Sequence, residues 1–395
     1  MAAPGTKGPL VVYFAPWSYW ERENRSQPLA RALAELGHQV LYLNYPLGRR
    51  LGSRFKRLLV RRTHQLEQPG LHLSVGGPFW RTYHWPDMIY VSPQGLSSRQ
   101  KAYVDFLLRL IQEEPFRGRE LVVLSSRMIS QPFVRRTRPR MYALDLEDPW
   151  SHFQEVWSTS REDLVPALRG FCREAQLVFA NGRKIAEGAQ GTFLEQEPQI
   201  LLNGVDPDKF HPDPSVPRPA DYPPGPSVLY SGMVNERLDF ELLEKVFSAL
   251  RQVNFVFLGG IYSHFVPTIR QLMECYPNVH FLGHRPVEEL FAYLQQADLF
   301  MIPSCQDEAW TRAFPAKVFE YFMFGKQSVS TFPLEDIPEQ YRFAIRVAQD
   351  AESFVRQVQE GLTGESRGQE ITAYGRRQTW SSRAEQVARA LGLGG

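Results

Sequence analysis

The chain has 395 residues, of which 43% are hydrophobic and 22% are charged, and its formal net charge is +2. This composition predicts a globular protein of about two domains and excludes a wholly disordered or fibrous chain. No apolar run reaches the ~18 residues that a transmembrane helix requires, and the N-terminal pattern is not that of a signal peptide. The three cysteines form no C-x-x-C pair, so we expect neither a zinc site nor disulfides, and a cytoplasmic location.

Charge is distributed unevenly along the chain. Residues 1–200 contain 27 Lys and Arg against 19 Asp and Glu, whereas residues 201–395 contain 18 against 24. Much of the basic excess lies in the segments 49–62 and 134–140. This asymmetry indicates an anionic surface or ligand that faces the N-terminal half.

The segment 49–62 has the pattern of a basic amphipathic helix, with seven positive charges in 14 residues. Its apolar residues recur at helical spacing, and its arginines fall on another face. We expect this segment to contact an anionic acceptor or membrane surface, which would make the protein peripheral at the inner face of a membrane. The alternative is a surface helix that packs on its own sheet.

Strand and helix patterns alternate in the first half. Short apolar runs predict strands at 10–15, 38–45, 120–126, 140–146 and 175–181. Helical spacing predicts helices at 26–37 and 99–114. This βαβ alternation predicts a parallel sheet that is covered by helices on both faces.

The segment 211–227 contains seven prolines in 17 residues, which predicts a linker or hinge. The alternation then restarts, with strands expected at 227–232, 254–260, 279–283, 298–304 and 327–332. Helices are expected at 239–251, 266–276 and 287–297, followed by a last helix at 381–392. We therefore expect domains at 1–206 and 207–376, with residues 377–395 packing back on the first domain.

Two motifs of the second half carry a resemblance to a known family. In ILLNGVDPDKFHPD (200–213), a strand ends at an Asn-Gly turn before an acidic segment. In FPAKVFEYFMFGKQSVST (314–331), Pro315 is placed to begin a helix that carries Glu320, and Gly325 ends that helix. With 230–243 and 279–303, these motifs resemble the C-terminal domain of GT-B-fold glycosyltransferases, in particular the large retaining family 4.

This resemblance implies a GT-B fold, an α/β architecture in which two Rossmann-like βα domains face each other across a cleft. It implies transfer of a sugar from a UDP-, GDP- or dTDP-type sugar nucleotide to a hydroxyl of a glycan, lipid-linked or small-molecule acceptor. Retention at the anomeric carbon is implied, with no metal, no other cofactor and no nucleic-acid partner. Two alternatives stay open: a catalytically silent binding or scaffold protein, and a sugar-nucleotide epimerase of the same fold.

The donor diphosphate needs backbone N–H groups at a helix start and one or two cations. The cations would be Lys317 and Arg237, to which we assign neutralisation of the departing diphosphate, and Gly232 would lie beside them. Arg237 could instead pair with Asp239 or Glu236. Phe314, Pro315 and Ala316 form the loop before this helix, and the N–H groups would come from residues 314–317, apart from Pro315, which has none.

The nucleoside would be bound by other residues of the same domain. Glu320 occupies the position at which the family's glutamate accepts hydrogen bonds from the ribose. His284 and Arg285 match the loop against which the base usually lies, although a plain surface loop is an equal alternative.

The chain departs from the family pattern at one position of this motif. The family has a second glutamate eight residues before Glu320, where this chain has Arg312. We expect Arg312 to add a cation to the diphosphate clamp, to bind an acidic donor sugar, or to pair with Asp307 or Glu308. These two acids are themselves candidates for contacts with the donor sugar.

Acceptor contacts are expected from the N-terminal half. Asp145 and Asp148 follow a predicted strand, where either one could orient the acceptor hydroxyl or act as a base. Asp148 could instead cap a helix. Trp17 and Tyr19 follow the first strand and could stack on an acceptor ring or belong to the core.

Overall fold

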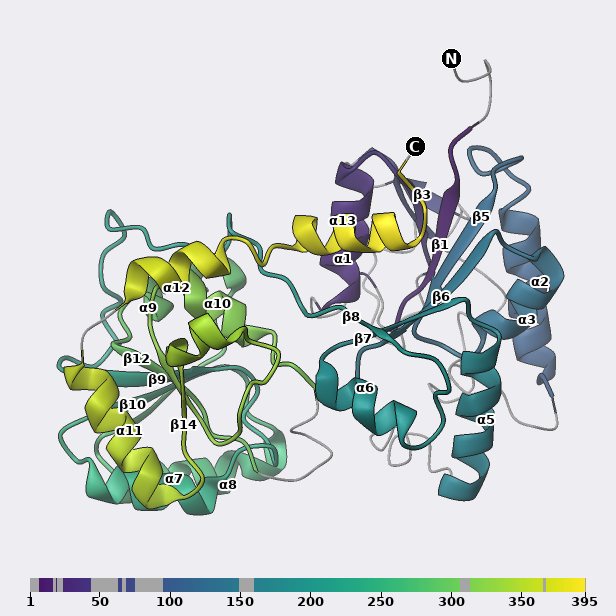
Figure 1. Ribbon diagram of the computed structural model, residues 1–395. Coiled ribbons are helices and arrows are strands. Elements are labelled where there is room, and N and C mark those ends of the chain that lie inside the picture. The colour runs from purple at the N-terminus through teal and green to yellow at the C-terminus, as the bar shows by residue number, and fades with distance from the viewer. Residues whose placement is uncertain are drawn as a thin grey trace. The chain divides into compact units, whose positions relative to one another are not determined.

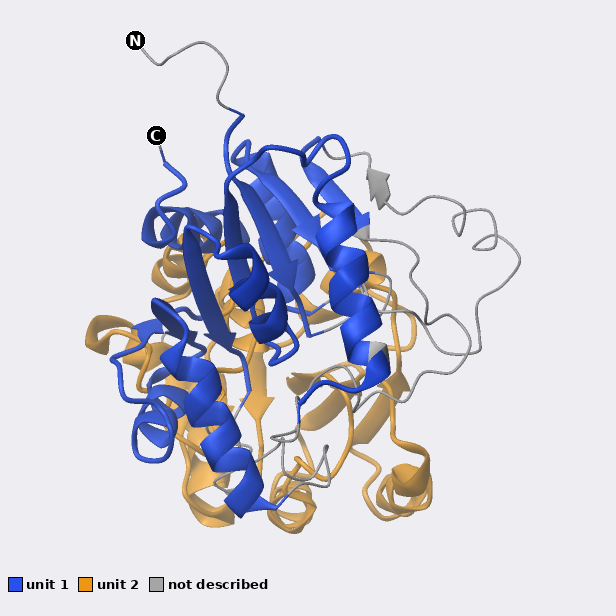
Figure 2. Cartoon of the chain, turned by 90° about the vertical axis from the view of Figure 1, so that its right-hand side faces the viewer, with its two compact units in different colours: residues 1–202, 380–395 blue, residues 203–379 orange. Residues whose placement is uncertain are grey.

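A computed structural model describes residues 7–16, 19, 24–43, 63–65, 69–74, 95–148, 160–305, 313–364 and 367–394. The chain divides into two compact units, residues 1–202 with 380–395 (unit 1) and residues 203–379 (unit 2), as Figure 2 shows. Each unit is a sheet of mainly parallel strands with helices in the connections (Figure 1), which confirms the two predicted Rossmann-like βα domains. None of the helices in the described ranges has the length and apolar character needed to cross a bilayer.

Unit 1 contains an eight-stranded sheet that is parallel except for one antiparallel pair at its edge, β3 with β4. The central strands are apolar on both faces, as strands covered by helices on both sides must be. Across the sheet the strands are β3 (Thr63–Gln65), β4 (Leu71–Ser74), β2 (Gln39–Tyr42), β1 (Leu10–Phe14), β5 (Leu121–Ser125), β6 (Met141–Leu146), β7 (Leu177–Ala180) and β8 (Gln199–Ile200).

Two helices of unit 1 begin at polar capping residues. Ser97 and Gln100 form a reciprocal capping box at the start of α2, and Ser160 caps α5. The helices are α1 (Ser26–Glu35), α2 (Ser98–Leu110), α3 (Ser130–Thr137), α5 (Arg161–Arg173), α6 (Arg183–Gln190) and α13 (Trp380–Ala390).

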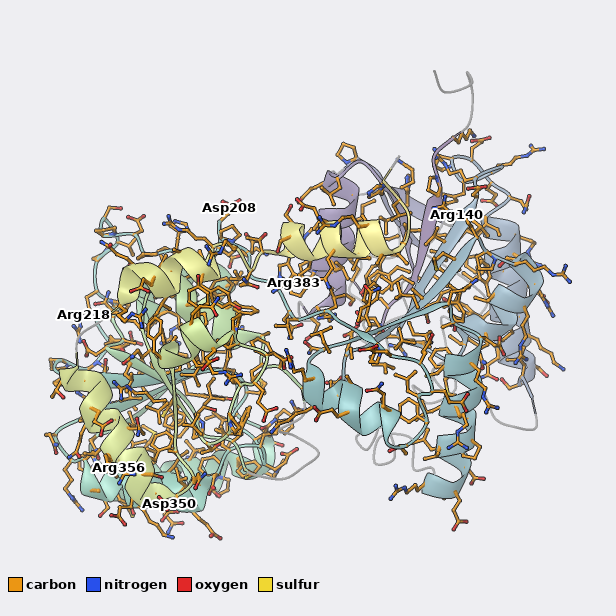
Figure 3. The ribbon with its side chains drawn as sticks, in the orientation of Figure 1. Arg140, Asp208, Arg218, Asp350, Arg356 and Arg383 are labelled. Carbon is orange, nitrogen blue, oxygen red and sulfur yellow. The ribbon has the colours of Figure 1, made fainter. Side chains whose placement is uncertain are left out.

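The last helix, α13, packs against α1 and belongs to unit 1 (Figure 1). It buries Ala384 and Val387 in the same apolar cluster as β1 and β2. Gln386 donates to the carbonyl of Ile200 at 2.8 Å, and Arg140, labelled in Figure 3, donates to that of Gly392 at 2.8 Å. The C-terminal segment therefore completes the core of unit 1.

Unit 2 contains a six-stranded sheet in which every neighbouring pair is parallel. Its strands, in order across the sheet, are β11 (Val279–Gly283), β10 (Asn254–Leu258), β9 (Ser227–Ser231), β12 (Leu299–Ile302), β13 (Ser328–Ser330) and β14 (Ile345–Val347). Its α-helices are α7 (Phe240–Ala249), α8 (Val266–Cys275), α9 (Val287–Leu294), α10 (Lys317–Met323), α11 (Ala351–Thr363) and α12 (Gly368–Gly375).

The proline-rich segment 211–227 lies within unit 2, because unit 2 begins at Asn203. It is fixed there by side chains: Tyr222 is buried and its hydroxyl is 3.0 Å from Ser227 Oγ, while Asp221 pairs with Arg285. The segment thus packs on unit 2 and is not the connection between the units that the sequence suggested. The chain instead passes between the units at residues 202–203 and 379–380.

Candidate functional site

The strand order of unit 2 marks the position at which a ligand is expected. From β9 the chain moves to β10 and β11 on one side, and it later returns to β12 on the other side of β9. In such a sheet the loops after β9 and β12 diverge, and ligands bind in the crevice at the carboxyl ends of these strands. The candidate donor site is therefore the loop after β9 together with α10.

Two glycine loops meet by close backbone contact at this edge. A Cβ on Gly259, after β10, would lie 1.8 Å from the carbonyl oxygen of Gly232, after β9, so only glycine fits at Gly259. The Gly232 N–H donates to Leu258 O at 2.8 Å, and the Val234 N–H donates to Gly260 O at 2.8 Å. The loop after β9 is consequently fixed by backbone contacts.

Lys317, the first residue of α10, lies at this loop. Its Nζ is 3.8 Å from the centroid of the Tyr230 ring, and a Cβ on Gly232 would lie only 2.8 Å from the same atom. The Tyr230 hydroxyl donates to Met233 O at 3.1 Å, which ties the ring to the loop. The structure thus brings together Lys317 and Gly232, and it adds Tyr230, which the sequence analysis missed.

The contacts of α10 explain why Lys317 is placed there. The Ser231 N–H donates to the Tyr321 hydroxyl at 2.9 Å, and the Tyr321 ring stacks on Phe300 of β12 at 3.9 Å between centroids. Burial raises the pKa of Tyr321 far above its usual value, so its hydroxyl stays neutral. Glu320 is partly exposed on the first turn of the helix, next to Tyr321 and three residues from Lys317.

The three predicted residues of the loop before α10 differ in their exposure to solvent. Phe314 is buried, and its carbonyl accepts a hydrogen bond of 3.0 Å from Asn203 Nδ2. Pro315 is partly exposed and Ala316 is exposed. Asn203, which the sequence analysis placed only in a turn, therefore supports this loop from the first residue of unit 2.

The other predicted residues of unit 2 lie in different settings. Arg237 is exposed, and its carbonyl accepts from Cys305 N at 2.8 Å. Arg285 forms an ion pair with Asp221 at 2.5 Å and donates from Nε to the Tyr293 hydroxyl at 2.9 Å, while His284 is exposed. The ion pair gives Arg285 a structural contact that the sequence analysis did not foresee.

Several predicted residues lie outside the described ranges, namely Trp17, Asp307, Glu308, Arg312 and the segment 49–62. Tyr19 is described, and its ring packs edge-on against Tyr42 with 5.3 Å between centroids. This contact with a buried tyrosine matches the alternative that Tyr19 belongs to the core. The basic stretch 134–140 contributes to ion pairs of Arg135 with Glu174, Arg136 with Asp105 and Arg140 with Glu120.

The sheet of unit 1 has a corresponding switch, between β1 and β5. Arg127, which is buried, connects the carboxyl ends of these strands by donating from Nε to Ala15 O at 2.7 Å. The next strand outward is β6, which carries the predicted carboxylates. The candidate acceptor edge of unit 1 is therefore formed by the ends of β1, β5, β6 and β7.

Asp145 is fully engaged in a buried ion pair. Arg25 donates from Nε and Nη2 to its two carboxylate oxygens at 2.9 and 3.0 Å, and Nη2 also donates to Leu201 O at 2.7 Å. The side chain of Asp145 is 0% exposed and that of Arg25 is 4% exposed. Of the two predicted carboxylates, Asp148 is partly exposed, whereas Asp145 lies beneath the surface.

Glu147, between the two predicted aspartates, is a candidate that the sequence analysis missed. Its carboxylate accepts from Ser126 Oγ at 3.0 Å, and its side chain is partly exposed. Burial of its carboxylate, with repulsion from Asp145, raises its pKa to about 8. A carboxyl group of this kind is protonated at neutral pH, which is typical of a functional site.

Comparison with solved structures defines the class of fold. Sucrose-phosphate synthase from Thermosynechococcus elongatus superposes with a TM-score of 0.69 at 14% identity over 97% of this chain and 98% of that one. HepE from Anabaena, in complex with UDP-glucose, gives 0.65 at 15% identity over 97% and 99%. The catalytic domain of starch synthase IV from Arabidopsis thaliana, bound to ADP and acarbose, gives 0.65 at 12% identity over 98% and 99%. The chain has the two-domain fold of the GT-B glycosyltransferases.

Comparison with family models matches only part of the chain. Residues 225–363, which form most of unit 2, match the family model of Glycosyl transferases group 1. No curated protein sequence shows significant similarity to the chain.

A substitution at Asp145 tests how much the buried Arg25–Asp145 ion pair contributes to stability. Asp145→Asn leaves the buried guanidinium without its counter-charge, so we expect a loss of about 3–5 kcal/mol in stability, measured as a lower melting temperature. Glu120→Gln, which alters an exposed pair with Arg140 at 3.5 Å, is the matched control and should cost at most about 1 kcal/mol. Equal melting temperatures for the two variants would contradict this account.

Proposed function

We propose that the protein is a glycosyltransferase that moves a sugar from a nucleoside-diphosphate sugar to an acceptor hydroxyl. In this proposal unit 2 binds the sugar nucleotide and unit 1 binds the acceptor. The observation that carries it is that the segment matched to the Glycosyl transferases group 1 model, 225–363, contains the Gly232 loop, Lys317 and Glu320. Gly232 and Lys317 lie close together at the edge of the sheet where a ligand is expected, and Glu320 follows three residues later on α10.

Lys317 is suited to a diphosphate. Its ammonium group lies against a glycine, so no side chain of that residue prevents a phosphate from approaching, and the Tyr230 ring holds it there. Negative charge grows on the diphosphate as the sugar–oxygen bond breaks, so a fixed cation stabilises the transition state more than the ground state. Arg237, exposed on the same loop, is the second candidate cation.

In unit 2, we propose that Glu320 binds the ribose of the sugar donor. A carboxylate one turn along α10 from Lys317 is placed to accept hydrogen bonds from ribose hydroxyls. HepE has been solved with UDP-glucose and starch synthase IV with ADP, which makes UDP- and ADP-glucose the first donors to test. Retention and independence of metal are parts of the proposal that derive from the family resemblance. The cytoplasmic location derives from the cysteine pattern, and the membrane-peripheral location derives from the basic segment 49–62.

The decisive experiment is incubation of the full chain with UDP-, ADP-, GDP- and dTDP-sugars, with and without sugar and lipid acceptors. We expect release of the nucleoside diphosphate to increase when a suitable acceptor is added. A changed sugar without release of nucleotide would favour an epimerase. Binding without turnover of any donor would favour a silent binding protein.

Glu320→Ala tests the ribose contact. Loss of the acceptor should weaken UDP binding by about 1–3 kcal/mol, or roughly 5- to 150-fold, in a calorimetric titration. Glu244→Ala, an exposed glutamate on α7 of the same unit, serves as the control. UDP analogues that lack a ribose hydroxyl should bind wild type and Glu320→Ala alike; a large difference between them would refute the assignment.

Tyr230 tests the placement of Lys317. Tyr230→Leu removes the aromatic face, worth about 0.5–2 kcal/mol, and should weaken UDP binding by roughly 2- to 30-fold. Tyr230→Phe keeps the ring and loses only the hydrogen bond to Met233 O, so its affinity should stay within about 5-fold of wild type. If the two variants bind UDP equally, the ring does not position Lys317.

A further inference from the structure

The carboxyl edge of the unit 1 sheet carries a polar cluster from four neighbouring strands. Tyr13 lies on β1, Ser126 follows β5, Glu147 follows β6 and Asn181 follows β7. The strands β1, β5, β6 and β7 are consecutive across the sheet, so these residues come from the same end of adjacent strands although they are up to 168 residues apart in sequence. None of the four was singled out from the sequence.

Glu147 is fixed within this cluster from both sides. Ser126 Oγ donates to its Oε1 at 3.0 Å, and Asn181 Nδ2 donates to its main-chain oxygen at 3.3 Å. These contacts leave the carboxyl group with one oxygen that no described hydrogen bond engages, on a side chain that is partly exposed. The carboxyl group is therefore held in position, with one oxygen left for a further hydrogen bond.

Two buried polar atoms of this cluster have no hydrogen-bond partner. The Tyr13 hydroxyl and Asn181 Oδ1 are buried and unpaired, with residue exposures of 0% and 4%. Burial, together with the charges of Glu147 and Asp145, raises the pKa of Tyr13 well above its usual value, so its hydroxyl keeps its proton. Buried polar atoms are nearly always paired, so each of these two atoms is available to a hydroxyl or water that binds beside Glu147.

The charges around Glu147 indicate what charge a ligand of this cluster can carry. Arg25, which precedes α1, is matched by Asp145, while Asp148 adds a second acid after β6. Tyr13 on β1 is neutral, and Ser126 and Asn181 carry no charge. An anionic ligand would be repelled by this set, so the cluster suits an uncharged, hydroxyl-bearing molecule.

Resting on the proposed function, we propose that Glu147 binds a hydroxyl of a neutral sugar or polyol acceptor, with Asn181 and Tyr13 forming the polar floor of the subsite. Burial and repulsion from Asp145 and Asp148 raise the pKa of Glu147 to about 8, whereas Arg25 and the Ser126 hydrogen bond lower it. At neutral pH the carboxyl group is the neutral acid and donates its proton in a hydrogen bond to the acceptor oxygen. Above pH 8 it ionises and this donor is lost.

The test is a titration of the full chain, followed by NMR, with a panel of neutral mono- and disaccharides and the matching uronic acids. At pH 7.0 we expect at least one neutral sugar to bind more tightly than its uronic acid. Its affinity for wild type should fall at least tenfold between pH 7.0 and pH 9.5. Glu147→Gln, a permanent neutral donor, should bind within about threefold of wild type at pH 7.0 and show no such fall.

Glu147→Ala should lose at least tenfold in affinity at pH 7.0. Glu120→Gln, a glutamate that precedes β5 at the opposite end of the same strands, should behave as wild type throughout. The inference is overturned if no sugar of the panel binds, if binding to wild type is the same at both pH values, or if Glu147→Gln shows the same fall. Weak binding by Glu147→Gln at pH 7.0 would also overturn it, because that result requires an ionised carboxylate.

A parallel calorimetric titration with UDP, ADP, GDP and dTDP separates this inference from the function on which it rests. Those nucleotides are expected at unit 2, where Glu147 has no part. Absence of nucleotide binding contradicts the proposed function, whereas a pH-independent sugar site contradicts the inference alone.

Discussion

The bidentate ion pair between Arg25 and Asp145 connects three distant parts of unit 1. Arg25 precedes α1, Asp145 belongs to β6, and the third hydrogen bond of the guanidinium goes to Leu201, the second-last residue before the chain enters unit 2. Both side chains are buried, so their mutual attraction must offset a large cost of desolvation. The exit of the chain from unit 1, the end of β6 and the start of α1 are thus positioned by one contact.

The same pair shapes the electrostatics of the carboxyl edge. Asp145 raises the pKa of Glu147 and Arg25 lowers it, so the protonation of Glu147 depends on a pair that is itself out of contact with solvent. In unit 2 a cation is held in another way, by an aromatic ring and a glycine, which leaves Lys317 partly exposed. The two units therefore present different chemistry at equivalent edges: carboxyl and hydroxyl groups in unit 1, and an ammonium group in unit 2.

The sheets could be predicted from the sequence because each buried strand is a short, continuous apolar run, as LVVYF and NFVFL show. The position of Lys317 on a helix that follows a strand was also evident from local pattern. The contacts that decide the role of each acid were not, because they join residues far apart in sequence: Arg25 and Asp145 are separated by 120 positions. No local pattern indicates which of Asp145, Glu147 and Asp148 is buried and paired, since that depends on which strands become neighbours.

For the proline-rich segment 211–227, too, the side-chain partners could not be predicted from the sequence. Its composition indicates that it forms neither helix nor strand, but the pairing of Asp221 with Arg285 and Tyr293 fixes it to unit 2. Likewise, the sequence indicates only that Tyr230 belongs to a strand, whereas the structure shows that Lys317 lies over its ring. Local structure was therefore predictable, whereas the partners of individual side chains were not.

The return of α13 to unit 1 has a consequence for the order in which the chain folds during synthesis. Unit 2 is one continuous segment, 203–379, whereas unit 1 needs residues from both ends of the chain, including Val387 in its core. As the protein emerges from the ribosome, unit 2 can reach its full set of contacts while unit 1 still lacks a helix against α1. Nascent unit 1 must expose that apolar face until α13 has been synthesised, and during this time the face is open to aggregation.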